Sequence, residues 1–181
     1  SYFQGDIKDW KADDQTQLCD IMPKDRRWSY PVRDIIKIIS DIEEFTEIKP
    51  EYGKGIVTCF IRIEGKPFGL LANDSQHLGG AIDSEGADKA SSFIEMCSEY
   101  GLPIISLVDT PGFMVGPDSE KEGAVRRMSN LFKIGSKVKV PLTAIFLRKG
   151  YGLGAQAMVG GSLHEPVYTA CLLYTSDAAD E

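Results

Sequence analysis

The chain has 181 residues, of which 43% are hydrophobic and 26% are charged, proportions that are typical of one globular domain. Its formal net charge of −7 argues against a nucleic-acid-binding face, which requires clustered Lys and Arg. No apolar run approaches the roughly 18 residues that indicate a membrane span. The opening residues SYFQGDIKDW show no signal-peptide pattern, so we expect a cytoplasmic protein, or one of the mitochondrial matrix if the source is a eukaryote.

Both ends of the chain differ in character from the middle. Residues 1–31 are polar and irregular, and we interpret them as a connecting arm. Residues 171–181, CLLYTSDAADE, break the preceding pattern and resemble the translation of a sequencing adapter, so we expect them not to be natural protein sequence. The folded domain is therefore predicted to cover residues 32–170.

Alternating strand and helix patterns follow one another along residues 32–170. The first half predicts a helix at 32–41, a brief strand at 45–48, a hairpin of strands at 56–63 and 67–72, and a loop at 73–83. A helix at 84–100 then ends at Gly101, and a buried strand at 103–108 is stopped by Asp109 to Gly112. The remaining patterns predict a helix at 120–135, a buried strand at 140–147 and a helix from about Ala155. This alternation indicates an α/β fold with right-handed crossovers.

The most unusual stretch is RKGYGLGAQAM, residues 148–158, which directly follows the last predicted strand. Glycine and alanine leave backbone N–H groups accessible, and the start of a helix directs such groups toward an anion. This composition suits an oxyanion hole, in which preorganised N–H donors meet a developing negative charge. It suits tight packing without any ligand equally well, so spacing alone leaves both interpretations open.

Two other nucleotide-binding interpretations fail on their own motifs. The stretch LVDTPGF resembles the Asp-x-x-Gly of GTPases, but no G-x-x-x-x-G-K-[ST] precedes it. The glycines at 150, 152 and 154 do not satisfy G-x-G-x-x-G.

The four cysteines are scattered, and His77 and His164 each stand alone, so we expect free thiols and no metal site. Cys59 and Cys97 fall on apolar elements and are predicted to be core residues.

Four strings taken together are far more specific than any one of them. FIRIEGKPFGLLAN, GAIDSEGADKASSFI, LPIISLVDTPGFMVGPDSEKEGAVRR and VPLTAIFLRKGYGLGAQAM occur in this order. They resemble the C-terminal half of the carboxyltransferase β-subunit family of biotin-dependent acyl-CoA carboxylases, including propionyl-CoA, acetyl-CoA and methylcrotonyl-CoA carboxylases. The resemblance runs from about Trp28 to Pro166.

This resemblance implies a crotonase-like α/β fold of ββα units, with an N-terminal half that holds acyl-CoA and a C-terminal half that receives carboxybiotin. It implies carboxyl transfer from biotin, borne by a carrier domain, to the α-carbon of an acyl-CoA. It also implies association with a biotin carboxyl carrier or biotin carboxylase subunit, a homohexamer, and no nucleic-acid or membrane partner. Because only the C-terminal half is matched, we expect this chain to be inactive alone.

The resemblance also assigns roles to individual residues. Gly154 and Ala155 match the family's Gly-Ala pair, whose backbone N–H groups form an oxyanion hole. Their neighbours in the motifs are expected to line the biotin site: Gly112, Phe113, Tyr151, Gly152, Gln156 and Ala157. Asp109 to Gly112 are expected to shape the loop beside the pocket. Arg126 and Arg127 are expected to face solvent, and Lys149 either to steer an anionic substrate or to pack and form a salt bridge.

One position departs from many propionyl-CoA-type members. The residue two after the Gly-Ala pair is acidic in those members, whereas here it is Ala157, so the resemblance does not select propionyl-CoA. Two alternatives to an acyl-CoA carboxylase remain at this stage. One is a non-catalytic crotonase-like module for subunit assembly, in which the Gly154 and Ala155 N–H groups would be buried instead of facing an open groove. The other is a subunit of a biotin-dependent sodium-pump decarboxylase.

Overall fold

The computed structural model of the chain describes residues 16–23, 25, 27–41, 44–114, 116, 123–161 and 168–171. Its centre is a six-stranded mixed sheet in which the strands follow their chain order. The strands are β1 (Thr46–Glu47), β2 (Ile56–Ile63), β3 (Lys66–Asn73), β4 (Ile104–Thr110), β5 (Leu142–Gly150) and β6 (Tyr168–Cys171). The β1–β2 and β2–β3 pairs are antiparallel, and the pairs from β3 to β6 are parallel. The predicted α/β class is confirmed.

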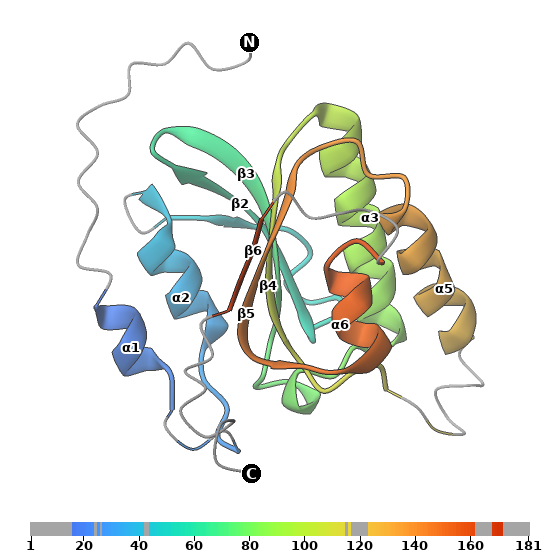
Figure 1. Cartoon of the computed structure of the whole chain (residues 1–181), viewed down its shortest axis with the longest axis horizontal. Helices are drawn as coiled ribbons and strands as arrows, with labels where there is room; N and C mark the ends of the chain where they lie inside the picture. The colour runs from blue at the N-terminus through green and yellow to red at the C-terminus, as the bar shows by residue number, and fades with distance from the viewer. Residues whose placement is uncertain are drawn as a thin grey trace.

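Helices cover both faces of this sheet (Figure 1). The short helices α1 (Gln17–Ile21) and α2 (Val32–Ile39) lie on one face, and α3 (Ser84–Tyr100), α5 (Ala124–Gly135) and α6 (Gly152–Met158) lie on the other. A single helical turn, η2 (Leu78–Gly80), follows β3. The two apolar layers between sheet and helices are separate clusters, one with α2 and one with α3. Burial of this apolar surface is the main force that holds the layers together.

The local signals that predicted the α2, hairpin and α3 segments are confirmed. In the hairpin, β2 and β3 pair along their whole length, and Ile63 faces Lys66 across a two-residue turn. The α3 helix begins where the Asp83 carboxylate accepts a 2.7 Å hydrogen bond from the Gly86 N–H, a typical N-cap. It ends at Gly101, whose φ of 71° and ψ of 24° are the left-handed conformation that glycine adopts without strain.

The structure corrects the predicted elements at four points. The connecting arm contains α1, which contacts α2. Asp109 and Thr110 do not stop β4 but form its last two residues, and β5 continues through Arg148 to Gly150. Charged residues inside a strand contradict a hydrophobic pattern, yet here Asp109 and Arg148 neutralise each other. As a consequence, α6 begins at Gly152 instead of Ala155. The start of the helix predicted at 120–135 lies outside the described residues.

The core prediction for Cys59 and Cys97 is confirmed, since both are free and fully buried. Burial raises the pKa of each thiol to about 12, so both stay protonated at neutral pH. Within the described ranges, no cluster of three or more His, Cys, Asp or Glu side chains could hold a metal ion. None of the helices seen in these ranges is both long enough and apolar enough to cross a membrane.

Candidate functional site

The carboxyl ends of β3, β4 and β5 meet at one edge of the sheet, because these three strands are parallel. In open α/β sheets this edge is where ligands bind. Here it carries the loop after Asn73, the turn after Thr110 and the glycine-rich turn after Gly150. The segments at 73–83, 109–113 and 148–158, which are far apart in the sequence, therefore lie at the same edge of the sheet.

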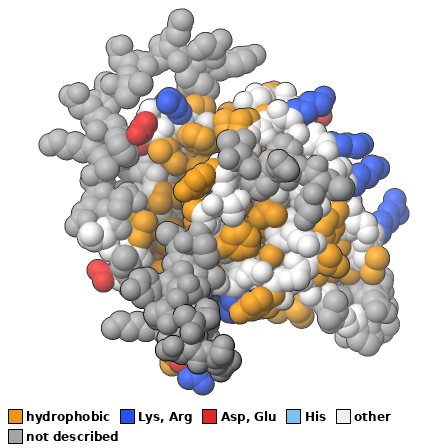
Figure 2. Space-filling view, viewed as in Figure 1, with side chains coloured by type: hydrophobic (Ala, Val, Ile, Leu, Met, Phe, Trp, Pro, Cys, Tyr) orange, Lys and Arg blue, Asp and Glu red, His pale blue; other side chains and the backbone are white. Residues whose placement is uncertain are grey.

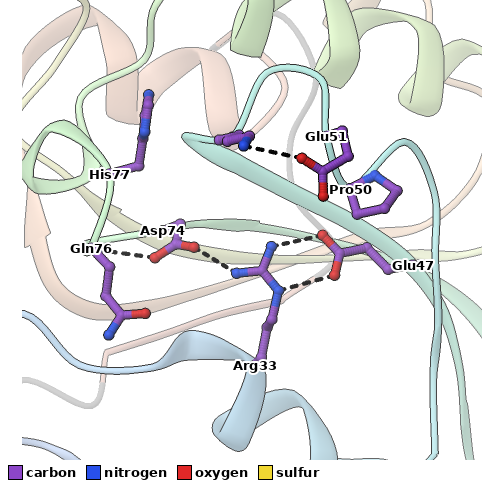
Figure 3. Close-up of a pocket in the computed structure, with 8 residues that line it drawn as sticks. Arg33, Glu47, Pro50, Glu51, Asp74, Gln76 and His77 are labelled. Atoms are coloured by element: carbon purple, nitrogen blue, oxygen red, sulfur yellow. Dashed lines mark hydrogen bonds and ion pairs between the residues drawn. The ribbon is translucent and has the colours of Figure 1, made fainter.

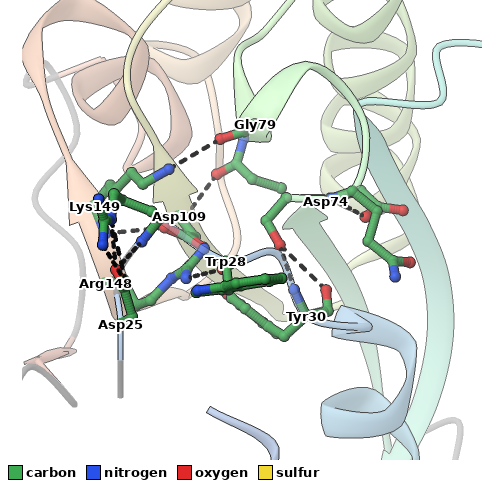
Figure 4. A network of polar contacts seen from close by, with 12 residues as sticks. Asp25, Trp28, Tyr30, Asp74, Gly79, Asp109, Arg148 and Lys149 are labelled. Atoms are coloured by element: carbon green, nitrogen blue, oxygen red, sulfur yellow. Dashed lines mark hydrogen bonds and ion pairs between the residues drawn. The ribbon is translucent and has the colours of Figure 1, made fainter. Parts of the chain in front are cut away.

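A buried ion pair lies directly beneath this edge (Figure 4). The Asp109 side chain is fully buried and that of Arg148 is 4% exposed. One carboxylate oxygen, Oδ2, accepts hydrogen bonds from Arg148 Nε at 3.1 Å and Nη2 at 2.9 Å. The other, Oδ1, accepts the Lys149 backbone N–H at 3.0 Å. The Asp109 N–H itself donates to the side-chain oxygen of Asn73 at 3.0 Å, so Asp109 joins β3, β4 and β5.

The segment Trp28 to Tyr30 completes this network from outside the sheet. Arg148 Nη1 donates to the carbonyl of Trp28, and the guanidinium lies 4.5 Å from the centroid of the Tyr30 ring. The Ser75 hydroxyl bonds both the N–H and the carbonyl of Tyr30, each at 3.1 Å. Burial, reinforced by the Asp109 charge, raises the pKa of the Tyr30 phenol. The residues predicted to be a connecting arm therefore support the site.

The strand pairing is irregular at the same point. Val108 pairs with Phe146 and Thr110 pairs with Gly150, so one residue of β4, Asp109, lies opposite three residues of β5. Bulges of this kind occur often beside active sites, where they redirect the chain. The bulge takes the Lys149 N–H out of the hydrogen bonds between the two strands, and this N–H donates instead to the Asp109 carboxylate.

The loop after β3 approaches Asp109 from the opposite side. Leu78, Gly79 and Gly80 all have positive φ, at 48°, 64° and 90°. A Cβ atom on Gly80 would lie 2.2 Å from the Asp109 carbonyl oxygen, so only glycine fits there. The Lys149 amine donates to the carbonyl of Gly79 at 3.4 Å. Of the two roles expected for Lys149, the structure shows this polar packing contact.

The glycine-rich turn is held against the end of β4 by backbone contacts. The Tyr151 N–H donates to the Thr110 carbonyl at 3.2 Å. A Cβ atom on Gly154 would lie 2.7 Å from the Gly112 Cα, so the two glycines let the segments touch. Gly154 is in the first turn of α6, where helix geometry provides no acceptor for its N–H. The Ala155 N–H makes only a long bond, 3.4 Å, to the Tyr151 carbonyl.

The predicted site residues differ in exposure. Tyr151 is 58% exposed, and Gly152 and Gln156 are also exposed, whereas Gly154 and Ala155 are buried. Ala157 is fully buried in the α3-side core, where its methyl group packs among apolar side chains. The structure thus presents Tyr151, Gly152 and Gln156 at the surface, with Ala157 behind them. It buries Gly154 and Ala155, which is the arrangement expected of the assembly-module alternative and not the open groove expected of an enzyme half.

Gly112 and Phe113 form the facing wall of the turn. The Thr110 hydroxyl bonds both the N–H and the carbonyl of Gly112, at 3.0 and 3.1 Å. The half-buried Phe113 bridges to Ile82 next to α3, and its ring lies 6.2 Å from that of Phe132. Asp109 to Gly112 therefore shape the segment that the glycine-rich turn contacts.

The remaining polar residues singled out in the sequence lie apart from the turn. His77 Nε2 is 3.6 Å from the Asp83 carboxylate, and His164 lies outside the described residues. Arg126 is exposed, as expected, while Arg127 is half-exposed and forms a 3.0 Å ion pair with Asp88. The ion pairs given for His77 and Arg127 do not involve the glycine-rich turn.

A polar hollow of about 360 Å³ lies beside α2, away from the glycine-rich turn (Figure 3). Arg33 is its central group: it forms two bonds to Glu47, at 2.8 and 2.9 Å, and one of 2.6 Å to Asp74. These carboxylates raise the pKa of the Arg33 guanidinium, with Glu47 the larger cause. Nothing in the sequence indicated this triad, because its members are 14 and 41 residues apart. The Arg33 and Lys54 side chains at this hollow are paired with carboxylates of this chain, so it shows charge pairing within the fold.

The face that carries α5 and α6 exposes apolar side chains (Figure 2). Among the large ones, Val125 is 68% exposed, Leu153 63% and Tyr151 58%. Two of these flank Gly152 at the start of α6. The candidate site is therefore bordered by apolar surface, which in proteins often marks a place of contact.

Comparison with known proteins gives consistent matches. The family model described as the carboxyl transferase domain matches residues 4–175. A biotin-dependent acetyl-/propionyl-coenzyme A carboxylase β5 subunit of Mycobacterium tuberculosis is 35% identical over 156 residues, which are 86% of this chain and 28% of that protein.

Two solved structures are also similar. A single-chain, multi-domain long-chain acyl-CoA carboxylase is 51% identical with a TM-score of 0.86, over 90% of this chain and 17% of that one. The hexameric transcarboxylase 12S, solved with methylmalonyl-CoA bound, is 34% identical with a TM-score of 0.84, over 88% of this chain and 31% of that one. The chain thus spans less than a third of the length of these relatives.

Proposed function

We propose that this chain, which belongs to the carboxyl transferase domain family, forms the carboxybiotin-facing side of an active site that moves a carboxyl group from biotin to the α-carbon of an acyl-CoA. The fold is the crotonase-like α/β fold of the solved carboxyltransferases. The activity of the whole protein is part of the proposal, because the chain spans less than a third of the length of these relatives.

The observation that carries the proposal is the contact between Gly154 and Gly112. It places the first turn of α6, with the Gly154 N–H unused by the helix, at the carboxyl end of β4. Carboxybiotin supplies an activated carboxyl group, and its release leaves negative charge on a ureido oxygen. Backbone N–H donors that are fixed before the reaction stabilise such charge without any titratable side chain. Of the three glycines in the turn, Gly152 has open space beside it, whereas the Phe146 ring and the Gly112 backbone occupy the space beside Gly150 and Gly154.

The roles of the two neighbouring backbone groups follow from their bonds. The helix gives the Gly154 N–H no acceptor, although Gly154 is buried in this chain, whereas the Ala155 N–H would have to exchange its long bond to Tyr151 for one to the ligand. We assign Gly154 as the principal donor and Ala155 as the second. Tyr151, Gly152 and Gln156 border the entrance, Gly112 and Phe113 form the opposite wall, and Ala157 supports the turn from the core.

The partners that this proposal requires are a biotin-bearing carrier domain and an acyl-CoA-binding half. The exposed apolar side chains Tyr151, Leu153 and Val125 give that second half a surface to cover. The transcarboxylase 12S relative is hexameric, so we propose an oligomer in which the two halves of the site meet. A protein with these partners works in the cytoplasm or the mitochondrial matrix, in acyl-CoA and fatty acid metabolism.

The activity test compares the chain alone with a chimera. In the chimera, the chain replaces the matching segment of transcarboxylase 12S, and transfer of the carboxyl group from methylmalonyl-CoA to free biotin is measured. We expect transfer by the chimera and none by these 181 residues alone, because they span only 31% of transcarboxylase 12S. Transfer by the isolated chain would contradict the division of the site. A folded, hexameric chimera without transfer would favour the assembly-module alternative.

A further inference from the structure

The bulge between β4 and β5 decides where the glycine-rich turn lies. Between the pairs Val108–Phe146 and Thr110–Gly150, β5 contains two more residues than β4. With regular pairing, Thr110 would lie opposite Arg148, whereas in the structure it lies opposite Gly150. Since a strand advances about 3.3 Å per residue, the turn would then move by roughly 7 Å relative to the end of β4.

The hydrophobic pattern cannot prevent such a slip. Side chains alternate between the two faces of a sheet with a period of two, so a one-residue slip exchanges core and surface but a two-residue slip keeps every side chain on its face. Something other than apolar burial must therefore select the bulged register at this point.

The two charged residues at the bulge provide that selection. The Asp109 carboxylate accepts the Lys149 N–H through one oxygen and two Arg148 donors through the other. These groups belong to the bulged residues themselves. The third Arg148 donor reaches the Trp28 carbonyl, and the guanidinium covers the Tyr30 ring. In the slipped register the Lys149 N–H would leave Asp109, and a buried carboxylate would lose a partner, which is costly.

We propose that Asp109 and Arg148 are positioning residues that hold β5 in its bulged register and thereby set Gly154 against Gly112. They act on the site through the backbone of residues 149–154 and do not contact the reacting atoms. The catalytic consequence rests on the function proposed above, whereas the register itself is a property of this chain alone.

Amide hydrogen exchange of the whole 181-residue chain tests the register. The variants are Arg148→Lys, which keeps the charge but loses the forked contact, and Asp109→Asn. We expect exchange of the Lys149 and Tyr151 amides to accelerate at least tenfold. The Ile104 amide, which bonds Pro141 at the other end of the same strand pair, should change less than threefold. Arg33→Lys is the matched control, since it weakens an ion-pair cluster away from the turn and should leave Lys149 and Tyr151 protected.

A purely structural role would give a different pattern. If the variants accelerate Lys149, Tyr151 and Ile104 by the same factor, the pair only adds to global stability and the proposal is wrong. If Asp109→Asn does not fold, Arg148→Lys decides alone, and unchanged exchange at Lys149 and Tyr151 in that folded variant also overturns the proposal.

In an active chimera, Arg148→Lys should lower kcat at least tenfold with little change in KM for the acyl-CoA. An inactive parent chimera would refute the proposed function and leave the exchange result standing.

Discussion

Replacement of Gly154 with alanine is expected to lower carboxyl transfer at least a hundredfold in the chimera. Loss of one oxyanion-hole donor costs roughly 100- to 1,000-fold in other enzymes. Here the added Cβ would lie 2.7 Å from the Gly112 Cα and 2.8 Å from the Gly112 carbonyl carbon, both backbone atoms that cannot rotate away. The first turn of α6 must therefore move away from the end of β4, and its N–H donors move with it.

Stability changes less than activity in this variant, for a physical reason. Alanine is favoured over glycine inside a helix by about 1 kcal/mol, while overpacking costs about 1–3 kcal/mol. These contributions partly cancel, so we expect a net loss of at most about 2 kcal/mol, measured by urea unfolding of the chain. Gly101→Ala is the control for transfer, because its Cβ would meet no atom within 4 Å and Gly101 is remote from the turn. Its left-handed φ of 71° should cost about 1–2 kcal/mol of stability without changing transfer. Full transfer by Gly154→Ala would show that this glycine is not required.

The Gly80→Ala substitution is expected to destabilise the chain by about 2–5 kcal/mol. Two costs add at this position: a left-handed conformation disfavours a side chain by about 1–2 kcal/mol, and a Cβ atom 2.2 Å from the Asp109 carbonyl oxygen adds an overpacking cost of about 1–3 kcal/mol. The neighbouring Gly79 has φ of 64° but open space around it, so Gly79→Ala should cost only about 1–2 kcal/mol.

Urea unfolding of the two variants therefore separates backbone strain from close contact. We expect Gly80→Ala to be the less stable by about 1–3 kcal/mol, because only this variant pushes the loop away from Asp109. Equal stabilities would mean that the loop moves without cost and that its contact with the end of β4 contributes nothing to the site.

The sequence predicted those elements whose signals are local. The α3 segment shows helical spacing with Asp83 before it and Gly101 after it, and the hairpin shows two β-branched runs around Glu64-Gly65. The glycine-rich turn was found because its composition is unusual and because four ordered motifs resemble a known family. The structure brings Gly112 and Gly154 into contact, a contact that the motifs alone did not predict.

The support beneath the turn could not be predicted in the same way. Arg148 contacts Asp109 from 39 residues away and Trp28 from 120 residues away, and no local pattern encodes such separations. The charges at Asp109 and Arg148 even suggested that their strands had ended. Only when both are placed in adjacent strands does each supply the partner that makes a buried charge tolerable.

The central claim is that the glycine-rich turn faces biotin and not the acyl-CoA. Gln156 tests it most directly, because its side chain is exposed beside Gly154 and Ala155 and is not part of the core. In the active chimera, we would measure KM for free biotin and for methylmalonyl-CoA before and after Gln156→Leu. We expect a several-fold rise in KM for biotin, with KM for methylmalonyl-CoA unchanged. A rise in KM for methylmalonyl-CoA alone would contradict it.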